Sequence, residues 1–328
     1  MAVTKEAFPG TSSSVVTTTK AGTFIPEIWS DEVIAAYKKN LVLANLVRKM
    51  SFRGKKGDTL HIPKPVRGSA SAKSAATAVT IQADTESEVQ VLINKHYEYS
   101  RFIEDITEAQ ALASLRSFYT EDAGYALAKR IDTDLVQLGR AFNGATVGTD
   151  DYATSASSTK AYIGSDGTTA YNSSSSNAAA LTDAAIRRTI QRLDDNDIPM
   201  DGRFFLIPPS SRNTLMGLAR YTEQAFIGNG DAIRNGEIGQ LYGMAVFASS
   251  NADTGAGSSG TDRICLMGHK DSMVLVEQLG IRSQTQYKQE YLGTLFTADT
   301  IYGVKALRTS ATSSASNASA AFALAVPA

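Results

Sequence analysis

The stretch from Glu104 to Phe142 reads EDITEAQALASLRSFYTEDAGYALAKRIDTDLVQLGRAF. Its apolar residues recur at steps of three and four: Leu112, Leu115, Tyr119, Ala123, Leu127, Ile131, Leu135, Leu138 and Phe142. This spacing predicts one long helix with a single apolar face, about 50 Å long at the rise of an α-helix. Thr107 and Gln110 fit a capping box at its start, and Asn143-Gly144 supplies a stop. A helix of this length needs an extended surface to lie against.

The bulk composition is that of a globular chain. It has 328 residues, of which 43% are hydrophobic and 20% charged, and a formal net charge of −1. This length allows one large or two modest domains, and the charge predicts no general attraction to nucleic acid or anionic membranes. We find no signal peptide and no apolar run of about 18 residues, so we expect no membrane partner. Cys265 lies in an apolar run and is interpreted as a buried residue; no disulfide within the chain is possible, which is typical of a reducing cytoplasm.

The N-terminal region begins with a Ser-, Thr- and Ala-rich segment, residues 1–22, which we interpret as a flexible arm. A short helix is predicted from Pro26, with proline in its first turn. Trp29, Val33 and Tyr37 share one face of this helix, and we interpret them as packing residues.

Residues 50–101 predict a long two-stranded hairpin with a polar tip, each arm of about 15 residues reaching on the order of 50 Å. Thr59 to Lys64 and Glu88 to Ile93 show the alternation of half-buried strands. A lone ribbon of this length is not stable in water, so it needs a partner surface.

Charge divides the two arms of this hairpin. Between positions 48 and 73 the basic residues are Arg48, Lys49, Arg53, Lys55, Lys56, Lys64, Arg67 and Lys73, against the single acid Asp58. The return arm carries Asp84, Glu86 and Glu88, and His61 lies on the outgoing arm. Such a pattern indicates either a solvated face or a contact in which one copy's basic arm meets an acidic surface of the next. Nucleic-acid binding is the weaker third interpretation, because aromatic residues do not alternate with the charges.

The second half of the chain predicts an α+β lobe. Residues 148–180 form a Ser/Thr/Gly-rich insertion that we expect to be exposed, although Tyr152, Tyr162 and Tyr171 could fix it to a surface. Thr182 caps a helix whose buried stripe is Ile186, Ile190 and Leu193, Arg203 to Ile207 is a buried strand, and Ser210 or Ser211 caps a further helix. The strands 245–249, 263–267 and 273–276 are assigned to the central sheet of this lobe. Residues 300–307 predict a strand returning to the long helix, and 309–328 a mobile tail.

Catalytic and metal-binding patterns are absent. The only histidines are His61, His96 and His269, none with metal-ligand spacing to Cys or carboxylates, and Asp194 to Asp197 is better interpreted as the turn ending a helix than as a calcium loop. We find no nucleophile elbow and no phosphate-binding glycine loop. We therefore expect no enzyme activity, no catalytic residues, no metal and no cofactor.

The order of these segments resembles a known family. IPEIWSDEVIAAYKKNLVLANLV leads to the basic hairpin and the long helix; RFFLIPPSSRNTLMG and GEIGQLYGMAVFASSN follow, and TIYGVKALR closes the chain. This arrangement is similar to the major capsid protein of tailed bacteriophages, with the Hong-Kong-97-like fold, over roughly residues 20 to 308. The resemblance implies an N-terminal arm (1–49), an extended hairpin or E-loop (50–101), a spine helix of a peripheral domain (102–147), the insertion (148–180), an axial domain (181–290), return strands (291–308) and a C-terminal tail (309–328).

The same resemblance implies the function and the partners. Copies would assemble in the host cytoplasm, as pentamers and hexamers, into the icosahedral shell of a virion around double-stranded DNA, which they would contact non-specifically. A separate scaffolding protein, a portal protein and optionally a decoration protein would be partners, and a short-tailed-phage type is the preferred subtype. Two alternatives stay open: a tube or fibre subunit of a virion, and a hydrolase or carbohydrate-binding module that uses the tyrosine-bearing insertion.

Overall fold

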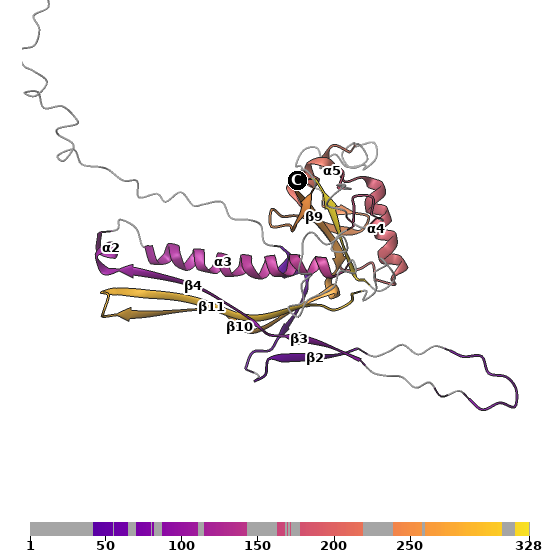
Figure 1. The fold of residues 1–328 in the computed structure, drawn as a ribbon, viewed down its shortest axis with the longest axis horizontal. Coiled ribbons are helices and arrows are strands. Elements are labelled where there is room, and N and C mark those ends of the chain that lie inside the picture. The colour runs from indigo at the N-terminus through magenta and orange to yellow at the C-terminus, as the bar shows by residue number, and fades with distance from the viewer. Residues whose placement is uncertain are drawn as a thin grey trace, which may run out of the picture.

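The computed structural model describes residues 42–54, 56–64, 70–79, 81, 87–110, 115–142, 163–167, 169, 171, 178–218, 239–257, 260–309 and 319–327. The predicted helix from Pro26, with Trp29, Val33 and Tyr37, lies outside them, as do residues 1–22, Tyr152 and Tyr162. Among the described residues the fold is α+β, as predicted, with two large sheets and one separate hairpin (Figure 1).

The first sheet is four-stranded, in the order β1-β10-β11-β4. It contains β1 (Arg48–Ser51), β4 (Lys95–Glu104), β10 (Met273–Lys288) and β11 (Gly293–Ala306). β10 pairs antiparallel with β11 and β11 antiparallel with β4, whereas β1 joins parallel to β10. Two predicted boundaries are therefore wrong. Residues 95–101 belong to this sheet and not to the hairpin, and β10 belongs here and not to the central sheet of the second lobe.

The second sheet forms the other lobe, in the order β12-β9-β5-β7-β6, with β8 beside β9. Its strands are β5 (Arg203–Ile207), β6 (Gln240–Leu241), β7 (Met244–Ala248), β8 (Thr254–Gly257), β9 (Gly260–His269) and β12 (Ala321–Val326). α4 (Asp183–Asp195), α5 (Pro209–Met216) and the short η3 (Lys270–Ser272) complete the described elements of this region. Tyr242 and Gly243, both at positive φ, make the two-residue turn between β6 and β7.

Several local predictions for this lobe are confirmed. The Thr182 hydroxyl accepts a hydrogen bond from the Ala185 N–H and so caps α4, while Ile186 and Leu193 are buried on its inner face. β5 is buried along its whole length. Cys265 is buried, and burial raises the pKa of its thiol to about 12. The Asp194 to Asp197 segment ends α4 at Asp195 and turns at Asn196 and Asp197, as predicted. α5, by contrast, begins at Pro209, so Ser211 lies inside the helix and neither serine caps it.

The long helix is the spine predicted from the sequence, with a different start. β4 runs to Glu104 and α2 (Asp105–Gln110) follows directly, so Thr107 and Gln110 lie within the first helical turns and do not cap them. Residues 111–114, which would join α2 to α3 (Leu115–Gln137), lie outside the described part. α3 tightens into the 3₁₀ turn η2 (Leu138–Ala141) and ends at Phe142, at the predicted stop.

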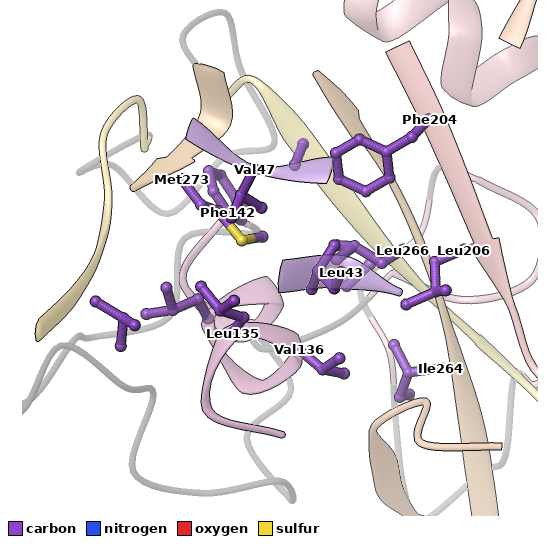
Figure 2. Packing of buried hydrophobic residues seen from close by; sticks show 14 of the residues in the cluster. Leu43, Val47, Leu135, Val136, Phe142, Phe204, Leu206, Ile264, Leu266 and Met273 are labelled. Atoms are coloured by element: carbon purple, nitrogen blue, oxygen red, sulfur yellow. The ribbon is translucent and has the colours of Figure 1, made fainter. Parts of the chain in front are cut away.

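The predicted apolar stripe of α3 forms the main core. Ala123, Leu127, Ile131, Leu135, Leu138 and Phe142 are all buried. The last four lie in one cluster with residues of both sheets, among them Leu206 of β5, Leu266 of β9 and Leu275 of β10. Figure 2 shows Leu135, Val136 and Phe142 with Leu43, the first residue of the short α1 (Leu43–Leu46), and Val47, which follows that helix. The helix therefore joins the two lobes into one continuous core.

Buried carboxylates fix how this helix is rotated. The Asp134 carboxylate accepts a hydrogen bond from the Tyr302 hydroxyl at 2.7 Å and lies 3.8 Å from the buried Lys95 ammonium. Asp132 accepts hydrogen bonds from the Ala44 N–H and the Asn251 amide, and burial raises the pKa of this carboxyl. An unpaired buried charge is costly, so the helix cannot turn without losing these partners.

The prediction that residues 309–328 form a mobile tail is wrong for the last of these residues. β12 is buried along its length and pairs antiparallel with β9, from Ala321 opposite Gly268 to Val326 opposite Arg263.

The prediction that residues 148–180 form an exposed insertion is also partly wrong. Ile163 bridges to Leu324, and Tyr171 is fully buried, with its hydroxyl donating to Asp262. The suggestion that Tyr171 fixes this segment is confirmed.

The third sheet is the hairpin of β2 (Thr59–Lys64) and β3 (Ser87–Leu92), six residues in each arm instead of the expected fifteen or so. Its base is anchored, because Val91, Phe52 and Ile93 are buried in a cluster with Val274 and Val276 of β10. Gly303 of β11 makes a close approach, since a Cβ there would lie 2.3 Å from the Leu92 carbonyl oxygen.

Leu324→Ala should show that β12 belongs to the folded core. Leu324 is fully buried, so we expect a loss of about 2–5 kcal/mol in the free energy of unfolding, measured by urea denaturation. Met200→Ala is the control, because Met200 is 72% exposed and should change this free energy by less than about 0.5 kcal/mol. Equal effects of the two substitutions would contradict the placement of β12.

Gly303→Ala should loosen the base of the hairpin. The new methyl group meets backbone atoms of Leu92 and Ile93, so we expect a cost of about 1–3 kcal/mol and faster amide exchange in β2 and β3. Gly280→Ala is the matched control, because the three atoms nearest to its Cβ all belong to the flexible end of the Arg53 side chain, which can move aside. Hydrogen exchange that is unchanged in the Gly303 variant would show that this contact does not hold the hairpin.

Candidate functional site

The candidate site is the hairpin beyond its anchored base. Residues 70–79 and Ile81 are exposed throughout, and residues 70–79 lie far from the rest of the described chain (Figure 1). Val79 is 70% exposed and Ile81 is 88% exposed. Large apolar side chains this exposed on a protruding tip are typical of an interaction surface. The described residues of the chain provide no cover for this tip.

The structure separates the predicted charged residues into two groups. Arg53 forms an ion pair with Glu277 of β10 at 3.1 Å and therefore belongs to the base. Glu88 accepts a hydrogen bond from Gln90 and interacts with His61 across the hairpin at 2.9 Å, and these contacts lower the pKa of its carboxyl. Some of the predicted charged residues therefore have their partners within the same copy. Lys56, Lys64 and Lys73 are exposed, while Lys55, Arg67, Asp84 and Glu86 lie outside the described residues.

A second exposed apolar surface was missed by the sequence analysis. It lies where β4 ends and β10 turns into β11, and it consists of Phe102, Ile106, Tyr291 and Leu292, here called the distal patch. The rings of Phe102 and Tyr291 pack edge to face with centroids 6.1 Å apart. The Tyr287 hydroxyl donates to Asp105, and the Asp105 N–H donates to the Leu292 carbonyl, so α2 is fixed to this turn. No periodicity marks the patch, because its residues come from two stretches of sequence that lie far apart.

The other two histidines, His96 and His269, also have partners within the chain. The His269 ring lies 2.8 Å from the Asp201 carbonyl oxygen, and its other nitrogen accepts from the Asp271 N–H. His96 lies beside Asp299, whose carboxyl pKa is lowered mainly by its hydrogen bonds from Arg282. Within the described ranges, no three His, Cys, Asp or Glu side chains are grouped so as to hold a metal ion. None of the described helices is long and apolar enough to span a membrane.

Solved structures of phage capsids share this fold. The chain superposes on a structure from Mycobacterium phage Che8 with a TM-score of 0.70 and 21% identity, covering 92% of this chain and 97% of the other. The capsid of Cyanophage P-SCSP1u gives a TM-score of 0.71 and 22% identity, with 94% of each chain covered. The capsid of a native GTA particle gives 0.61 and 10% identity, covering 96% of this chain and 99% of the other. The Hong-Kong-97-like fold implied by the sequence is therefore confirmed.

Sequence comparison gives a separate result. No curated protein matches the chain. The family model described as "Phage capsid protein" matches residues 24–307, a span that includes the hairpin, the spine helix and most of both lobes. This chain therefore belongs to the phage capsid protein family, whose members build the shell of the virion.

Proposed function

We propose that the exposed hairpin is the element through which copies of this major capsid protein join into a closed icosahedral head shell around double-stranded DNA. The observation that carries the proposal is the contrast between the two ends of the hairpin. Its base is buried against β10, whereas Val79 and Ile81 near its tip remain in water. A sister copy that covers the tip would remove this apolar surface from solvent.

The distal patch supports the same proposal. It exposes aromatic and aliphatic side chains at the end of the four-stranded sheet, away from the other lobe (Figure 1). Each copy then carries two apolar contact surfaces on separate parts of the molecule. A subunit with more than one self-contact surface can build an extended assembly, whereas a single two-fold contact would stop at a dimer.

The role we propose is structural and not catalytic. The titratable groups described above serve packing and ion pairs, and Cys265 is a buried thiol with a raised pKa. A net charge of −1 suits a shell that contacts packaged DNA non-specifically, because many cationic contacts would bind it tightly. Pentamers and hexamers, a scaffolding protein, a portal protein, a decoration protein and a short-tailed-phage type remain parts of this proposal.

Electron microscopy of the purified protein, alone and with a scaffolding protein, tests the assembly. We expect closed icosahedral particles. Helical tubes would favour the alternative of a tube or fibre subunit, and monomers under every condition would contradict a shell function. The hydrolase or carbohydrate-binding alternative gains no support from the structure, because Tyr171 of the insertion is buried and bonded to Asp262.

Shortening the hairpin by replacing residues 66–82 with a tight turn should abolish closed particles. The deleted residues lie outside the buried base cluster, so the monomer should keep its circular dichroism spectrum and its thermal midpoint within a few degrees. Met200→Ala, an exposed change in the other lobe, should assemble normally. Normal particles from the shortened chain would show that the hairpin does not join the subunits.

A further inference from the structure

β12 is buried on both of its faces, and the two faces lie in different cores (Figure 1). Its sequence, AFALAV, alternates alanine with a larger apolar residue, and each of the six is at most 1% exposed. The main core around the spine helix contains the small residues of one face: Ala321, Ala323 and Ala325. The cluster with residues of α4 and α5, here called the second core, contains the large residues of the other face: Phe322, Leu324 and Val326. One strand therefore completes two cores.

The alanine face fits closely against its neighbours. A Cβ on Gly139 of η2 would lie 3.7 Å from the Ala323 Cβ, and a Cβ on Gly268 of β9 would lie 2.7 Å from the Ala321 Cβ. Glycine on the neighbouring elements thus makes room for this face of the strand. Such a close fit between small residues leaves little space for another segment of chain to replace β12.

The two residues before β12 are bonded to four other segments. The Ser319 hydroxyl donates to the Phe142 carbonyl, at the end of the spine helix, at 2.6 Å. The Ser319 carbonyl accepts a hydrogen bond from the Asn196 amide, which follows α4, at 2.9 Å. The Ala320 N–H donates to the Arg308 carbonyl after β11, and the Ala320 carbonyl accepts from the N–H of the last residue of β9. Residues 319 and 320 therefore tie together parts of both lobes.

Both edges of β12 are paired. β9 runs along one edge for the whole length of the strand. On the other edge the Ile163 N–H donates to the Ala323 carbonyl at 2.8 Å, and the Ile163 carbonyl accepts from the Ala325 N–H at 2.7 Å. Burial of the three large side chains of β12 contributes a free energy comparable with the whole stability of a typical domain. The rest of the chain is therefore not expected to close either core by itself.

Two smaller clusters of the described residues contain no residue of β12. One is the base of the hairpin, and the other joins Ala123 and Leu127 of the spine helix to Phe296 and Ala298 of β11. These clusters can form before β12 docks. The described elements that β12 contacts all precede it in the sequence, so they leave the ribosome before it does.

We propose that β12 is a closing strand, which docks after the other elements and without which neither the main core nor the second core forms. A chain made only as far as Arg308 then holds the hairpin and the distal patch but lacks the fixed joint between the two lobes. Such a chain is excluded from the shell, a consequence that rests on the proposed function, whereas the order of folding does not.

Translation against an arrest peptide tests when the two cores form. The full chain is followed by a linker of variable length and then by an arrest peptide, whose stall is released by the pulling force of a folding chain. We expect release to rise about fivefold once the linker is long enough for residues 319–326 to leave the ribosome. Leu324→Asp should abolish this rise, because an unpaired charge is costly in the second core. Met200→Asp, at an exposed position, should preserve it.

Two results of this experiment would overturn the inference. The first is release that reaches its maximum while residues 319–326 are still inside the ribosome, because the cores would then form without β12. The second is a rise that Leu324→Asp leaves unchanged. Both results concern folding alone, so the inference can fail while the proposed function stands.

Pulse-labelling hydrogen exchange during refolding of the unsubstituted chain provides a second test. The amides of β9 and β12 should become protected together, at least about threefold later than those of β10 and β11, which form the clusters that lack β12. Protection of the β12 amides as early as those of β11 would contradict a closing strand.

Particles grown from mixed chains test the consequence for assembly. When a tagged variant is expressed together with the original chain, Leu324→Asp should be depleted about tenfold in the particles, because its cores stay open. Leu324→Met conserves the side-chain volume and should enter to within about twofold of the original. Equal entry of Leu324→Asp would overturn the inference. A failure of the original chain to form particles would count against the proposed function instead, and the arrest-peptide readout would still decide the order of folding.

Discussion

The burial of one helix stripe between two sheets is the constraint on which this molecule depends. Ile131, Leu135, Leu138 and Phe142 contact strands of both lobes, so neither sheet has a complete core without the helix. Close packing of this kind does not slide smoothly, because each shift opens voids or forces clashes. The spine therefore packs against both lobes in one core, and the hairpin beyond its base lies outside that core.

Polar groups within this core select one arrangement from several that hydrophobic burial alone would allow. Asp134 is paired with Tyr302 and Lys95, which come from two neighbouring strands of the four-stranded sheet. Asp132, two residues earlier, bonds the start of α1 and the loop after β7. Since buried charges must keep their partners, a rotation of the helix would cost both sets of bonds. The outward direction of the hairpin follows from this fixed frame, because its base packs on β10 of the same sheet.

The parts of the fold that could be predicted are those encoded by local periodicity. The stripe of α3, the cap at Thr182 and the buried strand at Arg203–Ile207 each depend on residues within one segment. Strand partners depend on distant residues, which explains the wrong assignment of β10. β12 was not recognised because it follows a Ser- and Ala-rich segment. At the Gly268–Ala321 pair, a Cβ on Gly268 would lie 2.7 Å from that of Ala321, so this position has no room for a side chain.

The location of the candidate site could be predicted from the sequence, but the roles of its individual residues could not. The sequence shows a run of charge between positions 48 and 88, yet only the structure shows that Arg53 and Glu88 have partners within the same copy. A groove at the base of the hairpin is lined by residues as far apart in sequence as Arg48 and Arg308, and no local pattern can reveal it. A subunit that repeats around a closed shell must carry both halves of each contact between unlike surfaces. The hairpin tip and the distal patch, on separate parts of one chain, are two exposed apolar surfaces available for such contacts.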